Sequence, residues 1–217
     1  MPLTKMGYPI FIPFLLSFFI TKAEAQELQM ALIPIGEVEL SHLQIAEEAV
    51  IAYYNADVHI PSETIALDTA LLTRKNYGDQ QMSMMVINAH ATNTELLSLG
   101  DAKYDLIIGI TDSALTIGKQ YRPGMTIRGL ADSDASVATI STHKLKQESA
   151  NRDEFTVNLS KVVKHEIAHV LDLEHCEVSE TCLMRNGFHF AKTTIDFCPA
   201  CEEKIDQRYL KHDVRDQ

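Results

Sequence analysis

The sequence predicts an α/β domain, built on a twisted, mixed but mostly parallel sheet with helices packed against it. Two observations lead to this prediction. Between residues 28 and 140, short apolar segments typical of strands are combined with a segment that has helical spacing. A long amphipathic helix follows them. The chain has 217 residues, of which 46% are hydrophobic, and this suits one compact domain with its own core.

The first 25 residues are typical of a signal peptide. Lys5 supplies a positive charge, residues 10–20 form an apolar run, and Ala23-Glu24-Ala25 has the small-x-small pattern of a cleavage site. The run is shorter than the ~20 residues of a membrane span. We therefore expect cleavage after Ala25, a single domain over residues 26–217, and a secreted or periplasmic protein. Membrane attachment through an uncleaved segment is the alternative.

The net charge is −11, and removing residues 1–25 takes away two lysines and one glutamate, which leaves −12. There is no basic run anywhere in the chain. So acidic a balance argues against nucleic acid or an anionic membrane surface as a partner.

The expected elements follow in order. Residues 28–35 are apolar enough for a strand, and residues 41–55 have the apolar spacing of a helix, with Ser41 as its cap. Residues 58–67 read as a strand that carries Pro61. Residues 81–99 fit a strand or a helix, and their methionines suit core filling.

Three more strands are expected before the long helix, at residues 105–111, 124–131 and 136–140. The second of them alternates apolar and polar residues, as an edge strand does. The helix itself has an apolar stripe at spacings of three and four, formed by Leu159, Val162, Val163, Ile167, Val170 and Leu171.

That helix carries His165-Glu166-Ile167-Ala168-His169, which reads H-E-x-x-H. The spacing puts two imidazoles on one face, roughly 6 Å apart along the axis, where both can bind one zinc ion with Glu166 beside it. A catalytic zinc site has three protein ligands and an open position. His175 is the candidate for the third ligand.

With His175, the pattern is similar to H-E-x-x-H-x-x-G-x-x-H of the metzincin peptidases, except that Asp172 replaces the glycine. Cys176 follows directly, then Cys182-Leu183-Met184, then Cys198-Pro199-Ala200-Cys201. This continuation resembles an archaemetzincin. Residues 109–112 and 137–141 also resemble the strands of that family.

The resemblance implies an N-terminal subdomain over residues 26–175 and a small C-terminal subdomain over residues 176–217. It places Met184 at the Met-turn beneath the metal. It also implies that the strand at residues 124–131 faces the cleft, where an extended peptide could pair with it. Ile205 and Tyr209, four residues apart, suggest a closing helix.

Cys176, Cys182, Cys198 and Cys201 are the only cysteines of the chain, and two close pairs are typical of a four-thiolate structural zinc site. Disulfides are the alternative, because export brings a protein into oxidising conditions. We expect two zinc ions, one catalytic and one structural.

The predicted function is that of an exported zinc metallopeptidase, which hydrolyses peptide bonds with a zinc-activated water and Glu166 as general base. The expected partner is a peptide or protein substrate, and the protein is expected to be a monomer. Aminopeptidase and endopeptidase action both stay open. So do a non-catalytic zinc-binding module and a zinc hydrolase with a different third ligand, such as Asp172 if the helix runs on.

Overall fold

The computed structural model describes residues 27–62, 64–67, 72–77, 82–99, 104–117, 126–186, 190 and 192–212. The predicted signal peptide lies outside these ranges. Among the helices of the described part, none combines the length and the apolar character needed to cross a bilayer.

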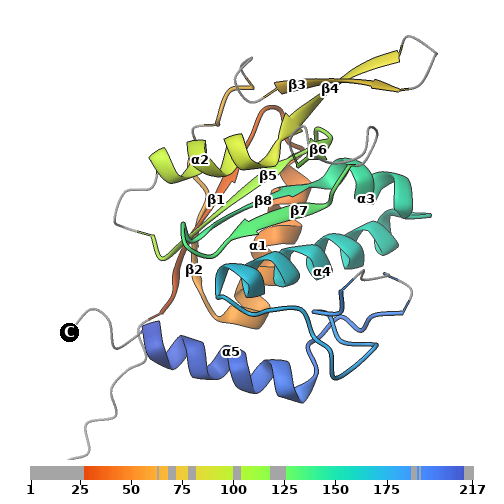
Figure 1. Cartoon of the computed structure of the whole chain (residues 1–217). Helices are drawn as coiled ribbons and strands as arrows, with labels where there is room; N and C mark the ends of the chain where they lie inside the picture. The colour runs from red at the N-terminus through yellow and green to blue at the C-terminus, as the bar shows by residue number, and fades with distance from the viewer. Residues whose placement is uncertain are drawn as a thin grey trace, which may run out of the picture.

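The main sheet has five strands in the order β2-β1-β5-β8-β7 (Figure 1). Their bounds are β1 Gln29–Pro34, β2 Asp57–His59, β5 Leu106–Thr111, β7 Gly129–Asp132 and β8 Val137–Ser141. All neighbours pair in parallel except β7, which runs antiparallel to β8 at the edge. The mostly parallel sheet and the position of β7 at its edge are thus confirmed.

Both faces of this sheet are buried, because helices cover each of them. Helices α1 (Leu40–Tyr54) and α4 (Arg152–Val170) pack on one face, and α2 (Ala89–Leu99) packs on the other (Figure 1). Alternate residues of β1 enter the two cores: Met30 and Leu32 face the α1 and α4 side, whereas Ala31 and Ile33 face the α2 side. The period of two in a strand explains this division.

The ambiguous segment at residues 81–99 forms a strand and then a helix. Strand β4 (Met82–Asn88) lies between β3 (Leu72–Tyr77) and β6 (Leu115–Thr116) in a second, smaller sheet, and α2 follows at once. The side-chain oxygen of Asn88 accepts a hydrogen bond from the backbone N–H of His90 at 3.1 Å. Asparagine stabilises a helix start in this way. The methionine side chains lie outside the described part, so their packing stays a prediction.

Two expectations about the first half of the chain are wrong. The N-cap of α1 is Glu39, which makes no side-chain capping bond, and Ser41 already lies inside the first turn. The expected strand at residues 58–67 is only β2 and an isolated bridge between Ile65 and Ile35. Pro61 follows β2 closely, and proline cannot donate to a ladder.

The edge strand is shorter than expected. It starts at Gly129, while Ile127 forms an isolated bridge with Leu115. Residues 124 and 125 of the predicted strand lie outside the described part. The sequence also did not lead us to expect α3 (Thr142–Glu148), which connects β8 to α4.

Helix α4 begins with a well-formed cap. The side chain of Asn151 accepts a hydrogen bond from the Glu154 N–H at 2.9 Å, and the Glu154 carboxylate accepts one from the Ala150 N–H at 2.8 Å. Asp153 and Glu154 also place negative charge in the first turn, where the helix dipole favours it. The predicted apolar stripe is buried against the sheet and α1.

The chain after α4 is tied to that helix. The Lys161 ammonium donates to the carbonyls of Phe190 and Thr193, both at 2.8 Å, and Lys164 donates to the Ile195 carbonyl at 2.8 Å. Helix α5 (Pro199–His212) confirms the closing helix. Buried residues of this segment belong to the same core as α1 and α4. The division into two subdomains at residue 175 stays a prediction.

Candidate active site

The end of α4 brings the third histidine back toward the first two. The helix stops at Val170, and Asp172 adopts φ +62°. Its N–H donates to the His169 carbonyl at 2.8 Å, and the Leu173 N–H donates to the Ala168 carbonyl at 2.9 Å. These two bonds form a Schellman motif, in which the left-handed residue is normally glycine. The helix therefore does not run on through Asp172.

The three imidazoles converge through one kind of atom. His169 Nε2 lies 3.1 Å from His165 Nε2 and 3.3 Å from His175 Nε2. Zinc binds imidazole nitrogen at about 2.0–2.1 Å, and tetrahedral ligands at that radius are roughly 3.3 Å apart. The spacing of the donors therefore fits a zinc ion.

Hydrogen bonds fix the tautomers of two of these rings. His165 Nδ1 lies 2.9 Å from the Leu183 carbonyl, and His169 Nδ1 lies 2.7 Å from the Leu173 carbonyl. A carbonyl only accepts, so each Nδ1 carries the proton and each Nε2 keeps a lone pair for a metal.

The three rings are also kept neutral. Burial, followed by the neighbouring His169, lowers the pKa of His165 to about 3, and burial lowers the pKa of His169 and His175 as well. Neutral rings are the form that binds a metal. Lone pairs that face one another at about 3 Å repel, and a cation between them removes this repulsion.

The four cysteines form a second candidate metal centre. All are free thiols in this structure, and their sulfur atoms lie within 4.8 Å of one another. Cys176 Sγ is 3.7 Å from Cys198 Sγ, close to the roughly 3.8 Å between thiolates that bind zinc tetrahedrally at about 2.3 Å. Pro199 opens α5 inside the Cys198–Cys201 pair, a position that suits proline.

Hydrogen bonds to backbone carbonyls connect this cysteine cluster to the histidine site. The Cys176 N–H donates to the Met184 carbonyl at 2.7 Å. Leu183, which lies between Cys182 and Met184, supplies the carbonyl that orients His165. Met184 is fully buried, and its role as a Met-turn stays a prediction.

Glu166 is placed beside the histidines and is buried. Its residue is only 8% exposed, and burial raises the pKa of its carboxyl group to about 8. A general base works best with a pKa near the operating pH. Glu166 and all three histidines line one cavity of about 770 Å³.

The cavity runs between an edge strand and an acidic loop. Gly129, Leu130 and Ala131 of β7 line it on the strand side, and Asp172, Glu174 and Glu177 line it on the loop side. Among the strands that the structure describes, none covers the outer edge of β7, so this edge can pair with an extended peptide.

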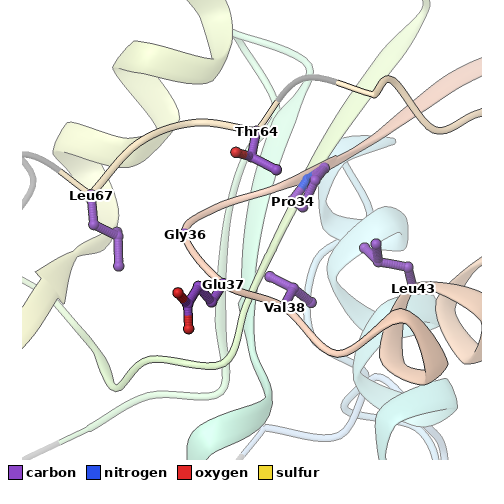
Figure 2. Close-up of a pocket in the computed structure, with 7 residues that line it drawn as sticks. All are labelled: Pro34, Gly36, Glu37, Val38, Leu43, Thr64 and Leu67. Atoms are coloured by element: carbon purple, nitrogen blue, oxygen red, sulfur yellow. The ribbon is translucent and has the colours of Figure 1, made fainter.

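Another cavity, of about 630 Å³, lies at the carboxyl end of β1 (Figure 2). Its lining comes from the end of β1, the following turn, α1 and the segment before residue 68: Pro34, Gly36, Glu37, Val38, Leu43, Thr64 and Leu67. Only one of these side chains is ionisable, and none belongs to a cluster of possible metal ligands. The lining of this cavity therefore provides few groups for catalysis or metal binding.

A third group of possible ligands consists of Glu39, His42 and Asp112. A cation is already present there, because the Lys146 ammonium lies 3.0 Å from Glu39 and 3.4 Å from Asp112. His42 Nδ1 is also bonded to the Asp112 carboxylate at 2.7 Å. We interpret the group as an ionic connection between α1, β5 and α3.

The structure thus brings the three predicted histidines and the four cysteines together in two clusters, with Glu166 in the same cavity as the histidines. It also adds residues that sequence reasoning missed: the carbonyls of Leu173 and Leu183, and Gly129. A carbonyl leaves no sequence signal. A glycine inside a strand does leave one, since it often marks a close approach of another group.

The fold and the convergent histidines define the class of this protein as an α/β protein with a candidate metal site at the end of a long helix. The sequence profile of Peptidase family M54 matches residues 30–207, so the chain belongs to that family. The resemblance seen in the cysteine and histidine motifs is therefore confirmed.

The archaemetzincins of Aeropyrum pernix and Saccharolobus solfataricus are both 34% identical to this chain, over 109 and 128 residues. These regions cover 48% and 54% of this chain, and 54% and 64% of the two relatives. The alignments therefore span less than two thirds of either relative.

Two solved structures show the same fold. The archaemetzincin of Methanopyrus kandleri has a TM-score of 0.64 at 22% identity, covering 85% of this chain and 96% of that one. The archaemetzincin of Archaeoglobus fulgidus, complexed with malonate, has a TM-score of 0.59 at 23% identity, covering 82% and 99%.

Proposed function

We propose that this protein is an exported zinc-dependent peptidase that hydrolyses peptide bonds. The observation that supports the proposal best is the convergence of three histidine Nε2 atoms beside Glu166, in a cavity that follows an edge strand. A set of neutral nitrogen donors with an adjacent carboxylate is suited to hydrolysis, and the strand offers a place for the substrate.

His165, His169 and His175 would hold the catalytic zinc. When bound, zinc lowers the pKa of a water molecule from ~15.7 toward ~7 and polarises a carbonyl group. Glu166 accepts the proton of the attacking water and later returns it to the leaving amine. Strand β7 holds the peptide through main-chain hydrogen bonds, which orients the scissile bond toward Glu166.

The four cysteines would hold a second, structural zinc, because four thiolates leave no open position for a substrate. Purified protein should then contain about two zinc ions per chain and no disulfide. Metal analysis together with intact mass under denaturing conditions tests this. Two disulfides with one zinc would contradict it. The same mass tests the proposed export, since cleavage after Ala25 leaves a chain that begins at Gln26.

Metal analysis combined with turnover of a mixed peptide library tests the function. We expect zinc-dependent cleavage that chelation abolishes and added zinc restores, and the product masses distinguish aminopeptidase from endopeptidase action. A non-catalytic module would bind zinc without cleaving any peptide. A hydrolase with a different third ligand would keep its activity in His175→Ala.

A further inference from the structure

We infer that Gly129 is a positioning residue for the general base, because the absence of a side chain on the edge strand leaves the space that the Glu166 carboxyl group occupies. This inference deepens the proposed function. It assigns a specific task to one residue of β7 that does not itself bind metal.

The contact between the two residues is close. A Cβ atom added to Gly129 would lie 2.6 Å from each of Cγ, Cδ and Oε1 of Glu166. Carbon atoms in contact are normally 3.5–4.0 Å apart. The conflict involves the middle of the glutamate side chain as well as its tip, so a small rotation of the carboxylate does not relieve it.

The need for glycine here is steric and does not arise from the backbone. Gly36 is the only glycine with a positive φ among the described residues, and Gly129 is part of a regular ladder. Alanine could therefore adopt the backbone conformation of Gly129. What it could not do is share the space with Glu166.

The strand has little freedom to move away from the helix. Gly129 pairs with Ile140 of β8. The carbonyl of Arg128, the residue before Gly129, accepts a hydrogen bond from the Ser141 N–H at 2.7 Å. The Arg128 guanidinium is itself held by the Glu148 carboxylate, with two bonds of 2.8 and 3.0 Å.

The helix is equally fixed, since the residues of α4 on either side of Glu166 are buried. A side chain at position 129 would therefore displace the Glu166 carboxyl group rather than the backbone. The three heavy atoms nearest to the added Cβ all belong to Glu166 and none to a histidine, so Glu166 is the first group to be displaced.

The experiment compares Gly129→Ala with the wild type. A positioned proton acceptor contributes about 10²–10⁴ to the rate, so we expect kcat to fall by about 100-fold or more. KM should change by less than about threefold, and the zinc content should stay unchanged. A kcat within threefold of the wild type would overturn the inference.

Gly109→Ala is the matched control. Gly109 lies in β5, and its added Cβ would meet Ile35 and Leu96 at 2.5 and 2.8 Å, in the core and away from Glu166. This variant should lose stability but keep the kcat of the molecules that fold. An equal loss of kcat in both variants would show that overpacking alone explains the effect.

A measurement without turnover completes the test. Urea unfolding measures how Gly129→Ala changes the free energy of unfolding, once in the wild-type background and once in the Glu166→Ala background. We expect a loss of stability in the first background and little or none in the second, where the conflicting atoms are absent. The double variant should fold even if Gly129→Ala does not. Equal losses of stability in both backgrounds would show that the added Cβ does not conflict with Glu166. This result is independent of whether the wild type cleaves peptides.

Discussion

At the scale of single residues, Asp172 shows how a departure from a family pattern can be accommodated. It takes the left-handed conformation that ends α4, with φ +62°, and His175 reaches the other two imidazoles as a result. Aspartate tolerates this region better than most residues, although less well than glycine. The cost is therefore a modest local strain.

We expect Asp172→Gly to retain both zinc ions and to be neutral or more stable, by up to about 1 kcal/mol, because glycine adopts a positive φ without strain. Urea unfolding and metal analysis measure the two effects. His175→Ala is the contrasting variant, and it should lose the catalytic zinc alone. If Asp172→Gly lost zinc while His175→Ala kept it, the third ligand would be Asp172.

Glu166→Gln is the second substitution at this scale. The amide is nearly isosteric with the carboxylate but cannot accept a proton, so kcat should fall by about 100-fold or more while the zinc content stays the same. Peptide turnover and zinc content, measured on one preparation of the variant, test this prediction. Activity above a few per cent of the wild type would contradict the assignment of Glu166 as base, and so would the loss of one metal equivalent.

At the scale of elements, the loop between α4 and α5 connects the two candidate metal centres. The carbonyl that fixes His165 belongs to Leu183, and the neighbours of Leu183 are Cys182 of the thiol cluster and Met184, whose carbonyl accepts from Cys176. The loop is also fastened to α4 by Lys161 and Lys164. The cysteine cluster is thus in a position to help orient His165.

We predict that Cys182→Ser loses one zinc equivalent and also weakens the remaining zinc site by about 10- to 100-fold, because partners that orient metal ligands typically have effects of this size. Competition with a chelator of known affinity measures the change. Val178→Ser on the same loop is the control, since Val178 is 80% exposed and should affect neither site. If the zinc affinity of the histidine site were unchanged in Cys182→Ser, the two metal centres would be independent of each other.

At the scale of the whole molecule, the charge of the protein and the lining of its cavity agree. The net charge is −11, and the cavity is lined by Asp172, Glu174 and Glu177 in addition to Glu166. No lysine or arginine is among the described residues that line it. Complementary charge favours the approach and the binding of cationic ligands.

Peptides with lysine or arginine beside the scissile bond should therefore be cleaved with a higher kcat/KM than matched peptides with glutamine. Exposed charge pairs contribute little individually, so we expect a preference on the order of fivefold, and it should decrease as salt screens the charges. The combined Glu174→Gln and Glu177→Gln variant should lose the preference and keep its turnover of the neutral peptide. A preference that is independent of salt and of both substitutions would rule out this explanation.

Features that depend on local spacing could be predicted from the sequence. His165 and His169 lie four residues apart on a helix with a clear apolar stripe, so their common face follows from helix geometry. The parallel strands β1, β5 and β8 were visible as short apolar segments, since a strand covered on both faces has to be apolar throughout. The cysteine pairs and His175 were recognisable from the motif that they continue.

Features that depend on residues far apart in the chain became visible only in the folded structure. The strand at residues 58–67 is mostly absent, because pairing depends on the neighbouring strand as much as on the apolar pattern. The carbonyl of Leu183 reaches His165 across 18 residues, and Gly129 meets Glu166 across 37 residues. Such contacts arise when separate elements pack together, and no periodicity within one segment encodes them.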